Sequence, residues 1–312
     1  NSWSNHLVNE RHDRQVADQL PFVIDGTPAT RVMGFVGASL HSFEAARATD
    51  NEIRCELVAA NSHVENVRSL HAQAAADTGI SDTWLNKAQR QKTLREYERA
   101  DRIYVHSTHT ARSFLNAGID ASRLVRTVLS VDSRFQPPAT RRPDDGPFRV
   151  VYVGRVDATK GIPLLFDALE HLDVPTELTL VGGWSTRAMR KYVQSRRPDL
   201  PPVHIRPGDP LPHLQRADVF VHPSYEDGFG YAPMEALACG VPVIVTEDTG
   251  MKEYVREGEN GYVVPTGSVD TIVEALQTVH RTPLASTSSL LPPEYYAQTE
   301  ASRGSKNSRS EE

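Results

Sequence analysis

The chain has 312 residues, of which 39% are hydrophobic and 24% are charged, and its formal net charge is −6. This length corresponds to about two domains, and the composition is that of a globular protein rather than a disordered, collagen-like or coiled-coil chain. The negative charge argues against a protein built mainly to bind nucleic-acid phosphates, and no run approaches the ~20 apolar residues of a membrane span. Cys55 and Cys239 are too few for a disulfide scaffold, so we expect a reducing, cytoplasmic compartment.

The first part of the chain predicts a parallel α/β unit, which we assign to residues 1–136. Three apolar runs are typical of strands, and a helical pattern follows each of them: residues 31–36, 55–59 and 102–105. A helix is expected from Thr108, with Ser107 as its N-cap and Gly118 at its end.

A proline-rich break separates this unit from the rest of the chain. Residues 136–147 contain four prolines and no apolar periodicity, so we interpret residues 137–147 as an interdomain linker. After Pro283 the sequence becomes polar, and we expect residues 283–312 to form a disordered tail.

Between linker and tail, residues 148–282 alternate regularly between strand and helix patterns. The expected strands are residues 149–153, 178–181, 218–222, 243–245 and 262–264. The expected helices begin near Pro163, surround Met189 and Val193, and cover residues 232–239, 251–256 and 269–279. Strict alternation of this kind predicts a parallel sheet. The fold class is therefore α/β, with two Rossmann-like domains.

Ligands of parallel sheets lie at the carboxyl ends of strands, where helix N-termini present free N–H groups. At one such end Gly154 and Arg155 follow a buried strand, and Lys160 lies five residues later beside Gly161. A guanidinium and an ammonium at a strand-to-helix turn suit a diphosphate. The alternative is an ordinary solvated loop with basic residues.

A second loop joins adjacent carboxylates to a glycine-rich turn. Glu226 and Asp227 precede Gly228-Phe229-Gly230, and Glu235 follows in the first turns of the next helix. The glycines allow backbone N–H groups to approach a ligand closely. Glu235 can accept hydrogen bonds from ribose hydroxyls, or it can merely stabilise the start of the helix. The sequence has neither a dinucleotide fingerprint nor a Gly-Lys-Ser/Thr phosphate loop, and it has no Asp-x-Asp, so we expect no metal and no cofactor.

Residues 149–276 resemble the donor-binding domain of the retaining glycosyltransferases of family 4 (glycosyl transferases group 1), which have the GT-B fold. The resemblance is carried by Val153-Gly-Arg155…Lys160-Gly161, by the two acids Asp227 and Glu235 that flank seven residues, and by the continuation Glu235-Ala-Leu-Ala-Cys-Gly-Val-Pro. Upstream, residues 100–107, 118–119 and 131–137 are similar as well. The GT-B fold implies two domains that face a central cleft.

The resemblance implies roles for these residues. Arg155 and Lys160 would neutralise the donor diphosphate, Glu235 would hold the ribose, and Asp227 with the backbone of residues 228–230 would hold the sugar. Gly154, Glu226 and Phe229 are expected to line the same donor site. A nucleotide-diphosphate sugar would pass its sugar to an acceptor hydroxyl with retention, and the leaving phosphate would take the proton. The acceptor could be a glycan, a lipid-linked molecule or a small molecule.

Two departures from the family pattern stand out. The first acid of the motif is Asp227 where Glu is usual, with Glu226 beside it. The first domain lacks an opening strand and Gly-rich loop before residue 30, and the usual C-terminal crossing helix is replaced by the polar tail. We therefore expect an incomplete first domain and a chain truncated at its N-terminus.

His63 follows a predicted strand where the family often places a histidine that reaches the donor sugar, so it is a candidate catalytic residue; a chance loop histidine is the alternative. Residues 83–102 are basic and could contact the inner face of a membrane peripherally, or could form a solvated helix face.

The sequence predicts a metal-independent glycosyltransferase of polysaccharide or glycoconjugate biosynthesis. Two alternatives remain: a non-catalytic GT-B subunit that binds nucleotide, and a GT-B sugar-nucleotide epimerase.

Overall fold

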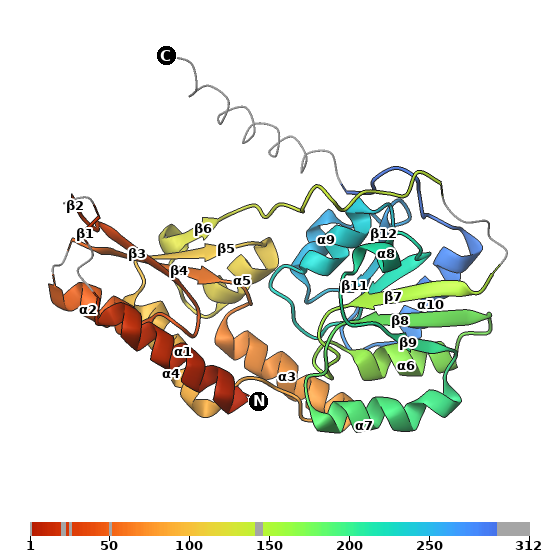
Figure 1. Cartoon of the computed structure of the whole chain (residues 1–312), viewed down its shortest axis with the longest axis horizontal. Coiled ribbons are helices and arrows are strands. Elements are labelled where there is room, and N and C mark those ends of the chain that lie inside the picture. The colour runs from red at the N-terminus through yellow and green to blue at the C-terminus, as the bar shows by residue number, and fades with distance from the viewer. Residues whose placement is uncertain (1, 20–22, 25–26, 50–51, 141–145, 292–312) are drawn as a thin grey trace, which may run out of the picture.

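The computed structural model of the protein describes residues 2–19, 23–24, 27–49, 52–140 and 146–291. The chain forms two α/β halves, and each contains a parallel sheet with helices packed against it (Figure 1). No helix in the described ranges is long and apolar enough to cross a membrane.

The first half is built on a four-stranded parallel sheet in the order β3-β4-β5-β6. Its strands are β3 (Arg31–Phe35), β4 (Arg54–Ala59), β5 (Arg102–Val105) and β6 (Leu124–Arg126), preceded by the short hairpin β1 (Val23–Ile24) and β2 (Thr27–Pro28). Its helices are α1 (Ser2–Ala17), α2 (Leu40–Thr49), α3 (Val64–Thr78), α4 (Lys87–Arg99), α5 (Thr108–Asn116) and the short 3₁₀ helix η1 (Ala121–Arg123).

The second half has a six-stranded parallel sheet in the order β12-β11-β10-β7-β8-β9. Its strands are β7 (Phe148–Val153), β8 (Thr176–Val181), β9 (Val203–Ile205), β10 (Val219–His222), β11 (Val243–Thr246) and β12 (Gly261–Val264). Its helices are α6 (Ile162–Glu170), α7 (Arg187–Arg196), α8 (Leu211–Leu214), α9 (Tyr231–Ala238), α10 (Val269–Arg281) and the 3₁₀ segments η2 (Arg197–Asp199) and η3 (Gly250–Tyr254).

The second sheet is buried on both sides. Val150 and Tyr152 pack into one core with α6, α7 and α10, whereas Val151, between them, packs into the other core with α8 and α9. Alternate residues of a strand point to opposite faces, which explains why β7 reads as a continuous apolar run. The strands predicted at 31–36, 55–59, 102–105 and throughout 148–282 are confirmed.

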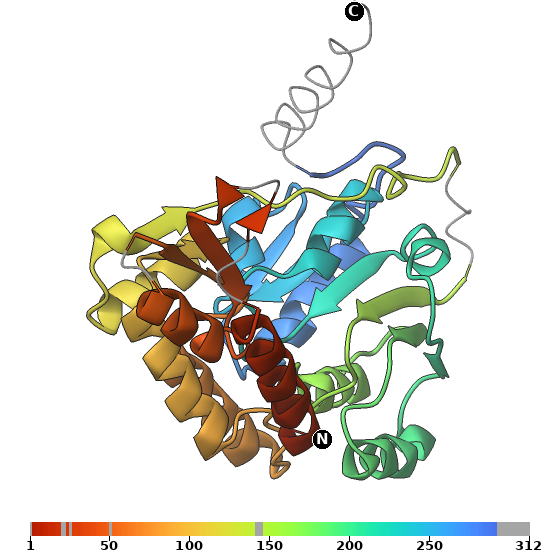
Figure 2. The same ribbon diagram turned by 60° about the vertical axis from the view of Figure 1, so that its left-hand side comes forward.

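Several elements differ from the expectation. Helix α1 packs along α2 and α4 (Figure 2), although its sequence carries little apolar periodicity. The buried Asp13 carboxylate explains the packing, since it accepts hydrogen bonds from the first turns of α2 at Ser42 and pairs with Lys92 of α4 at 2.9 Å. The helix predicted at 251–256 is only the 3₁₀ segment η3, and the short strands β6 and β9 were not predicted.

The described beginning of the polar tail is packed and corrects the expectation of disorder there. Ser286 donates its N–H to the Gly240 carbonyl, Leu290 donates to the Leu237 carbonyl, and Leu291 is 4% exposed. These contacts cover the end of α9 and extend the second core. The remainder of the predicted tail lies outside the described residues.

Candidate functional site

The site lies where the strand order of the second sheet reverses. Strands β8 and β9 continue the sheet on one side of β7, and β10 to β12 continue it on the other. Ligands of open parallel sheets bind outside the carboxyl ends of the strands at such a switch point. The loops after β7 and β10 are therefore in the expected position, and they are the two loops that the sequence analysis selects.

Gly161 allows the two loops to approach each other. Its φ is +74°, and a Cβ placed on it would lie 1.9 Å from the Pro223 carbonyl oxygen. Only glycine fits that space and that backbone conformation without a shift. The close approach puts Lys160, at the end of the first loop, beside Glu226 and Asp227 of the second.

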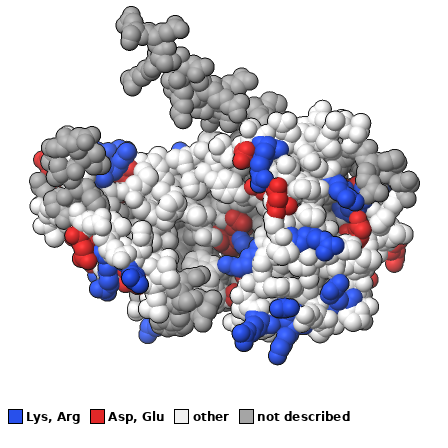
Figure 3. Space-filling model, viewed as in Figure 1, with Lys and Arg blue, Asp and Glu red and all other residues white. Residues whose placement is uncertain are grey.

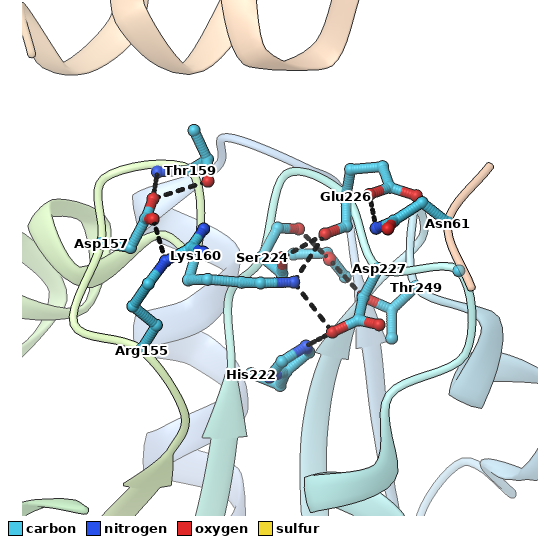
Figure 4. Close-up of polar contacts among 12 residues, drawn as sticks. Asn61, Arg155, Asp157, Thr159, Lys160, His222, Ser224, Glu226, Asp227 and Thr249 are labelled. Atoms are coloured by element: carbon cyan, nitrogen blue, oxygen red, sulfur yellow. Dashed lines mark hydrogen bonds and ion pairs between the residues drawn. The ribbon is translucent and has the colours of Figure 1, made fainter. Parts of the chain in front are cut away.

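Lys160, Asp227 and His222 form a polar cluster beneath these loops (Figure 4). The Lys160 ammonium donates to the Asp227 Oδ2 at 2.9 Å and to the Glu226 carbonyl oxygen at 3.0 Å. The His222 Nε2 lies 3.1 Å from the same Oδ2. The other carboxylate oxygen of Asp227, Oδ1, has no hydrogen bond to any described residue and remains able to accept one.

The cluster keeps Asp227 ionised. Burial alone would raise the pKa of this carboxyl, but the Lys160 ammonium and the His222 ring hold it well below its usual range. Burial lowers the pKa of His222, which favours the neutral ring, and the tautomer with its proton on Nε2 is the one that can donate to the carboxylate. Its Nδ1 is buried and has no hydrogen-bond partner in the described part of the chain.

Arg155 is held at the edge of the same loop by Asp157. Its Nε donates to the Asp157 Oδ2 at 2.6 Å, while Oδ1 accepts from the backbone and hydroxyl of Thr159. The Arg155 side chain is 43% exposed, so its guanidinium keeps donors available to a ligand. Asp157 was not predicted, although an acid two residues after the arginine was visible in the sequence.

Glu226 joins the two halves and does not present a free carboxylate. Its Oε2 accepts from Asn61 and its Oε1 from the Ser62 backbone N–H, both at 2.8 Å, and the residue is 2% exposed. Both oxygens are already satisfied by the first half. Glu226 lines the cleft beside the cluster with both carboxylate oxygens engaged in this interdomain contact, and its expected place in a donor site stays a prediction.

Gly228 marks a second interdomain contact. Its carbonyl oxygen accepts from the hydroxyls of Ser107 and Thr110, at 2.5 and 2.8 Å. A Cβ on Gly228 would lie 2.1 Å from the Ala60 carbonyl oxygen. The glycine is therefore needed for the backbone of one half to touch that of the other.

The remaining residues of the glycine-rich turn have separate roles. Gly230, with φ +93°, precedes α9, and Gly154, with φ +145°, ends β7. Phe229 is 2% exposed and its ring packs edge-on against Tyr231 and Tyr254. Its side chain belongs to the core, which leaves its main chain for the donor contact expected of the backbone of residues 228–230; that contact stays a prediction.

Glu235 lies on α9, away from the Lys160 cluster. Its carboxyl makes no hydrogen bond or ion pair with the residues that the structure describes, and burial raises its pKa to about 7. The nearby charges are Arg134, Asp132 and Asp209, and Arg134 pairs with Asp209 at 3.0 Å. Glu235 is therefore a partly buried acceptor without a partner, as a ribose contact requires.

His63 is placed in the core of the first half and not at the cluster. Its ring lies 4.9 Å from that of Tyr97 and 5.2 Å from that of Phe114, between centroids, and its Nδ1 caps α3 by accepting from the Glu65 N–H at 3.3 Å. Burial lowers the pKa of the ring. In this conformation the Nδ1 of His63 is engaged in the helix cap and its ring in aromatic packing, and the expectation that His63 reaches a donor sugar stays a prediction.

We expect His63→Ala to reduce stability and not donor binding. The substitution removes a helix cap and two ring contacts, which together contribute about 1–3 kcal/mol. Urea unfolding should show a lower midpoint, whereas titration with a nucleoside diphosphate should give an affinity close to that of the unchanged chain. A variant that kept full stability but lost much of its affinity for the nucleoside diphosphate would show that His63 contributes to donor binding.

A cleft of about 390 Å³ opens beside the cluster. The second half contributes Arg155, Thr159, Lys160 and Glu226 to its wall, and the first half contributes Asn61, His71 and Trp84 among others. Acidic and basic side chains meet in the corresponding hollow between the halves (Figure 3). The residues from the first half were not predicted, although Asn61 lies only two positions before the candidate His63.

Known proteins resemble this chain most clearly in its second half. Residues 134–287 match the family model of the glycosyl transferases group 1. The glycogen synthase of Mycobacterium tuberculosis is 31% identical over 163 residues, covering 50% of this chain and 39% of that protein. The D-inositol 3-phosphate glycosyltransferase of Pseudarthrobacter chlorophenolicus is 25% identical over 241 residues, covering 70% and 57%. The chain thus spans about two-fifths to three-fifths of the length of these relatives.

Solved structures show the same architecture over most of the chain. HepE of Anabaena, in complex with UDP-glucose, superposes with a TM-score of 0.68 at 16% identity and covers 94% of this chain and 81% of its own. Sucrose-phosphate synthase of Thermosynechococcus elongatus gives a TM-score of 0.67 at 22% identity and covers 89% and 73%. The predicted GT-B fold is therefore confirmed, while an incomplete first domain stays a prediction.

Proposed function

We propose that this chain, which carries a glycosyl transferases group 1 domain, transfers a sugar from a nucleotide-diphosphate sugar to an acceptor hydroxyl with retention of configuration. The observation that carries the proposal is the pair of cations, Arg155 and Lys160, at the switch point of the second sheet. A departing nucleoside diphosphate develops negative charge, and cations placed in advance stabilise it in the transition state. We propose that these cations do so without a metal or cofactor.

Each cation already has an acidic partner, so donor binding must rearrange the contacts. Lys160 would extend its ammonium from Asp227 toward the diphosphate, and Arg155 would use the guanidinium nitrogens that Asp157 leaves free. Acid partners of this kind keep long side chains oriented before the ligand arrives, which reduces the entropy lost on binding.

Asp227 is suited to hold a hydroxyl of the donor sugar. His222 binds its Oδ2 and can keep that contact when Lys160 turns to the diphosphate. The Oδ1 atom is then oriented by His222 and able to accept a hydrogen bond. We expect the leaving phosphate to receive the acceptor proton, because neither nearby carboxylate is a suitable general base. Both oxygens of Glu226 already accept hydrogen bonds, and the low pKa of Asp227 makes it a weak base.

Isothermal titration with UDP, GDP and their sugars tests the proposal, followed by an assay of sugar transfer and hydrolysis. A glycosyltransferase should bind one nucleoside diphosphate and turn over its sugar. Nucleotide binding without turnover would favour a non-catalytic subunit, and interconversion of the sugar would favour an epimerase. Absence of nucleotide binding would refute the proposed function itself.

A pH dependence of nucleotide binding is expected from Glu235. Burial raises its pKa to about 7, and a ribose hydroxyl donates best to the ionised carboxylate. Affinity should therefore fall as the pH falls from about 8 to about 6, by roughly tenfold if this group alone titrates. Titration calorimetry at several pH values measures this change in nucleotide affinity. The Glu235→Gln variant should bind more weakly and lose most of that slope, and an unchanged slope would contradict the ribose role.

The acceptor and the cellular setting are further parts of the proposal. Other relatives are named as an O-antigen chain mannosyltransferase B of Escherichia coli and a capsular polysaccharide biosynthesis glycosyltransferase of Staphylococcus aureus. Their names support a role in polysaccharide or glycoconjugate biosynthesis, with a glycan, lipid-linked or small-molecule acceptor. We propose a cytoplasmic protein that can contact the membrane peripherally.

A further inference from the structure

A second basic pocket lies on one face of the second sheet, across β7, β8 and β9. Its volume is about 250 Å³, and its wall includes Arg206, His213 and Arg216 beside the one-turn helix α8. The floor comes from β7, β8 and β9, at Arg149, Glu177, Thr179 and His204 among others, whereas the donor loops follow the ends of β7 and β10. Basic side chains gather over β7–β9 and α7 on this face (Figure 3).

The acids of the pocket are already occupied by other cations. Glu177 lies 3.9 Å from the Arg149 guanidinium and 3.7 Å from the His204 ring. Arg149 also lies 3.5 Å from Asp218, and Asp209 is paired with Arg134 at 3.0 Å. Arg206 and Arg216 have no ion pair among the residues for which the structure gives positions. With Arg134 and Asp209 paired, Arg149, Arg206 and Arg216 outnumber Glu177 and Asp218, so the pocket keeps an excess of positive charge.

His213 reports this excess of positive charge. Burial and then the charges of Arg206 and Arg216 lower its pKa, and Asp209 opposes the effect only in part. Cations that repel one another around a hollow are stabilised by an anion. Two guanidinium groups and a ring N–H supply the planar and single donors that phosphate oxygens accept.

We infer that this pocket binds a phosphate dianion, either as inorganic phosphate or as the phosphate group of a monoester or lipid headgroup. The volume is about eight times that of one water molecule in the liquid, which leaves room for a phosphate and a few attached atoms. The site is independent of the donor site, since the two clefts share no residue.

The direct test follows the His213 ring by NMR while inorganic phosphate is added to the whole chain at constant ionic strength. The His213→Gln variant assigns the signal. We expect saturable binding and a rise of about one unit in the pKa of His213. The Arg206→Gln and Arg216→Gln variants should each weaken binding at least tenfold. Arg187→Gln, an exposed cation of α7 outside the pocket, is the matched control and should not weaken it.

Two further binding experiments identify the source of the phosphate group. Glycerol phosphate tests a soluble monoester, and vesicles of phosphatidylcholine with phosphatidylglycerol test a headgroup. Binding of either kind that depends on Arg206 and Arg216 supports the inference and names the source. The inference would be overturned if Arg187→Gln weakened phosphate binding as much as the pocket variants do. It would also be overturned if no probe showed binding that depends on Arg206 and Arg216. The Lys160→Ala variant should leave the His213 response intact, which separates this result from the fate of the donor site.

Discussion

The Lys160→Ala variant is expected to lose about 100- to 1000-fold in the rate of sugar transfer. Lys160 lies in the loop that precedes α6, and its ammonium binds the Asp227 Oδ2 of the loop after β10 at 2.9 Å. Its removal leaves the departing diphosphate without the Lys160 cation, and among the described residues it leaves Asp227 with His222 as its side-chain partner. Both consequences raise the free energy of the transition state more than that of the bound ground state.

The fold should survive this change, because Lys160 lies in a loop and its side chain is 20% exposed to solvent. Circular dichroism and urea unfolding would check that. Lys191→Ala on α7 is the matched control, since it removes a cation from an exposed helix face of the same domain. Transfer by Lys160→Ala at a rate close to that of the unchanged chain would show that the diphosphate lies elsewhere.

The sequence was sufficient to predict the second sheet and the two loops at its switch point. Buried strand residues such as residues 150–152 form short apolar runs in the sequence, and the glycines and charges that follow such runs mark the strand ends. Local patterns of this kind depend only on neighbours along the chain. For the same reason α6, with Pro163 in its first turn, and α5, with Ser107 as its cap, were predicted correctly.

The sequence was insufficient wherever a residue's role depends on a distant partner. Glu226 looked like a free acid beside Asp227, but Asn61 and Ser62, more than 160 positions away, satisfy both of its oxygens. His63 looked like a loop histidine, but Tyr97 and Phe114 enclose its ring. His222 looked like the end of a strand, and only the folded loop shows that it fixes one oxygen of Asp227.

The interdomain contact at Gly228 yields the second prediction. The Gly228→Ala variant should reduce sugar transfer by about 100-fold while reducing nucleotide affinity only a few-fold. A Cβ here would lie 2.1 Å from the Ala60 carbonyl oxygen and 2.7 Å from the Asn61 Cα. Both obstacles are backbone, so the clash is relieved chiefly by moving the two halves apart. A displacement of about 1 Å between reacting groups can cost 100-fold in rate.

The same displacement weakens the other contacts between the halves. Ser107 and Thr110 would lose the Gly228 carbonyl, and Glu226 would lose Asn61. The residues that we assign to the diphosphate and the ribose, Lys160 and Glu235, both belong to the second half. Binding and turnover should therefore separate in this variant, with transfer failing while nucleotide still binds.

Gly183→Ala provides the matched control, because a Cβ on Gly183 meets nothing within 4 Å. Transfer assays and titration with the nucleoside diphosphate are compared for the two variants, and small-angle scattering measures whether the halves have separated. Equal losses of affinity and transfer would mean that the variant had unfolded the donor loop. Full transfer by Gly228→Ala would show that the close contact of the two halves is not required for the reaction.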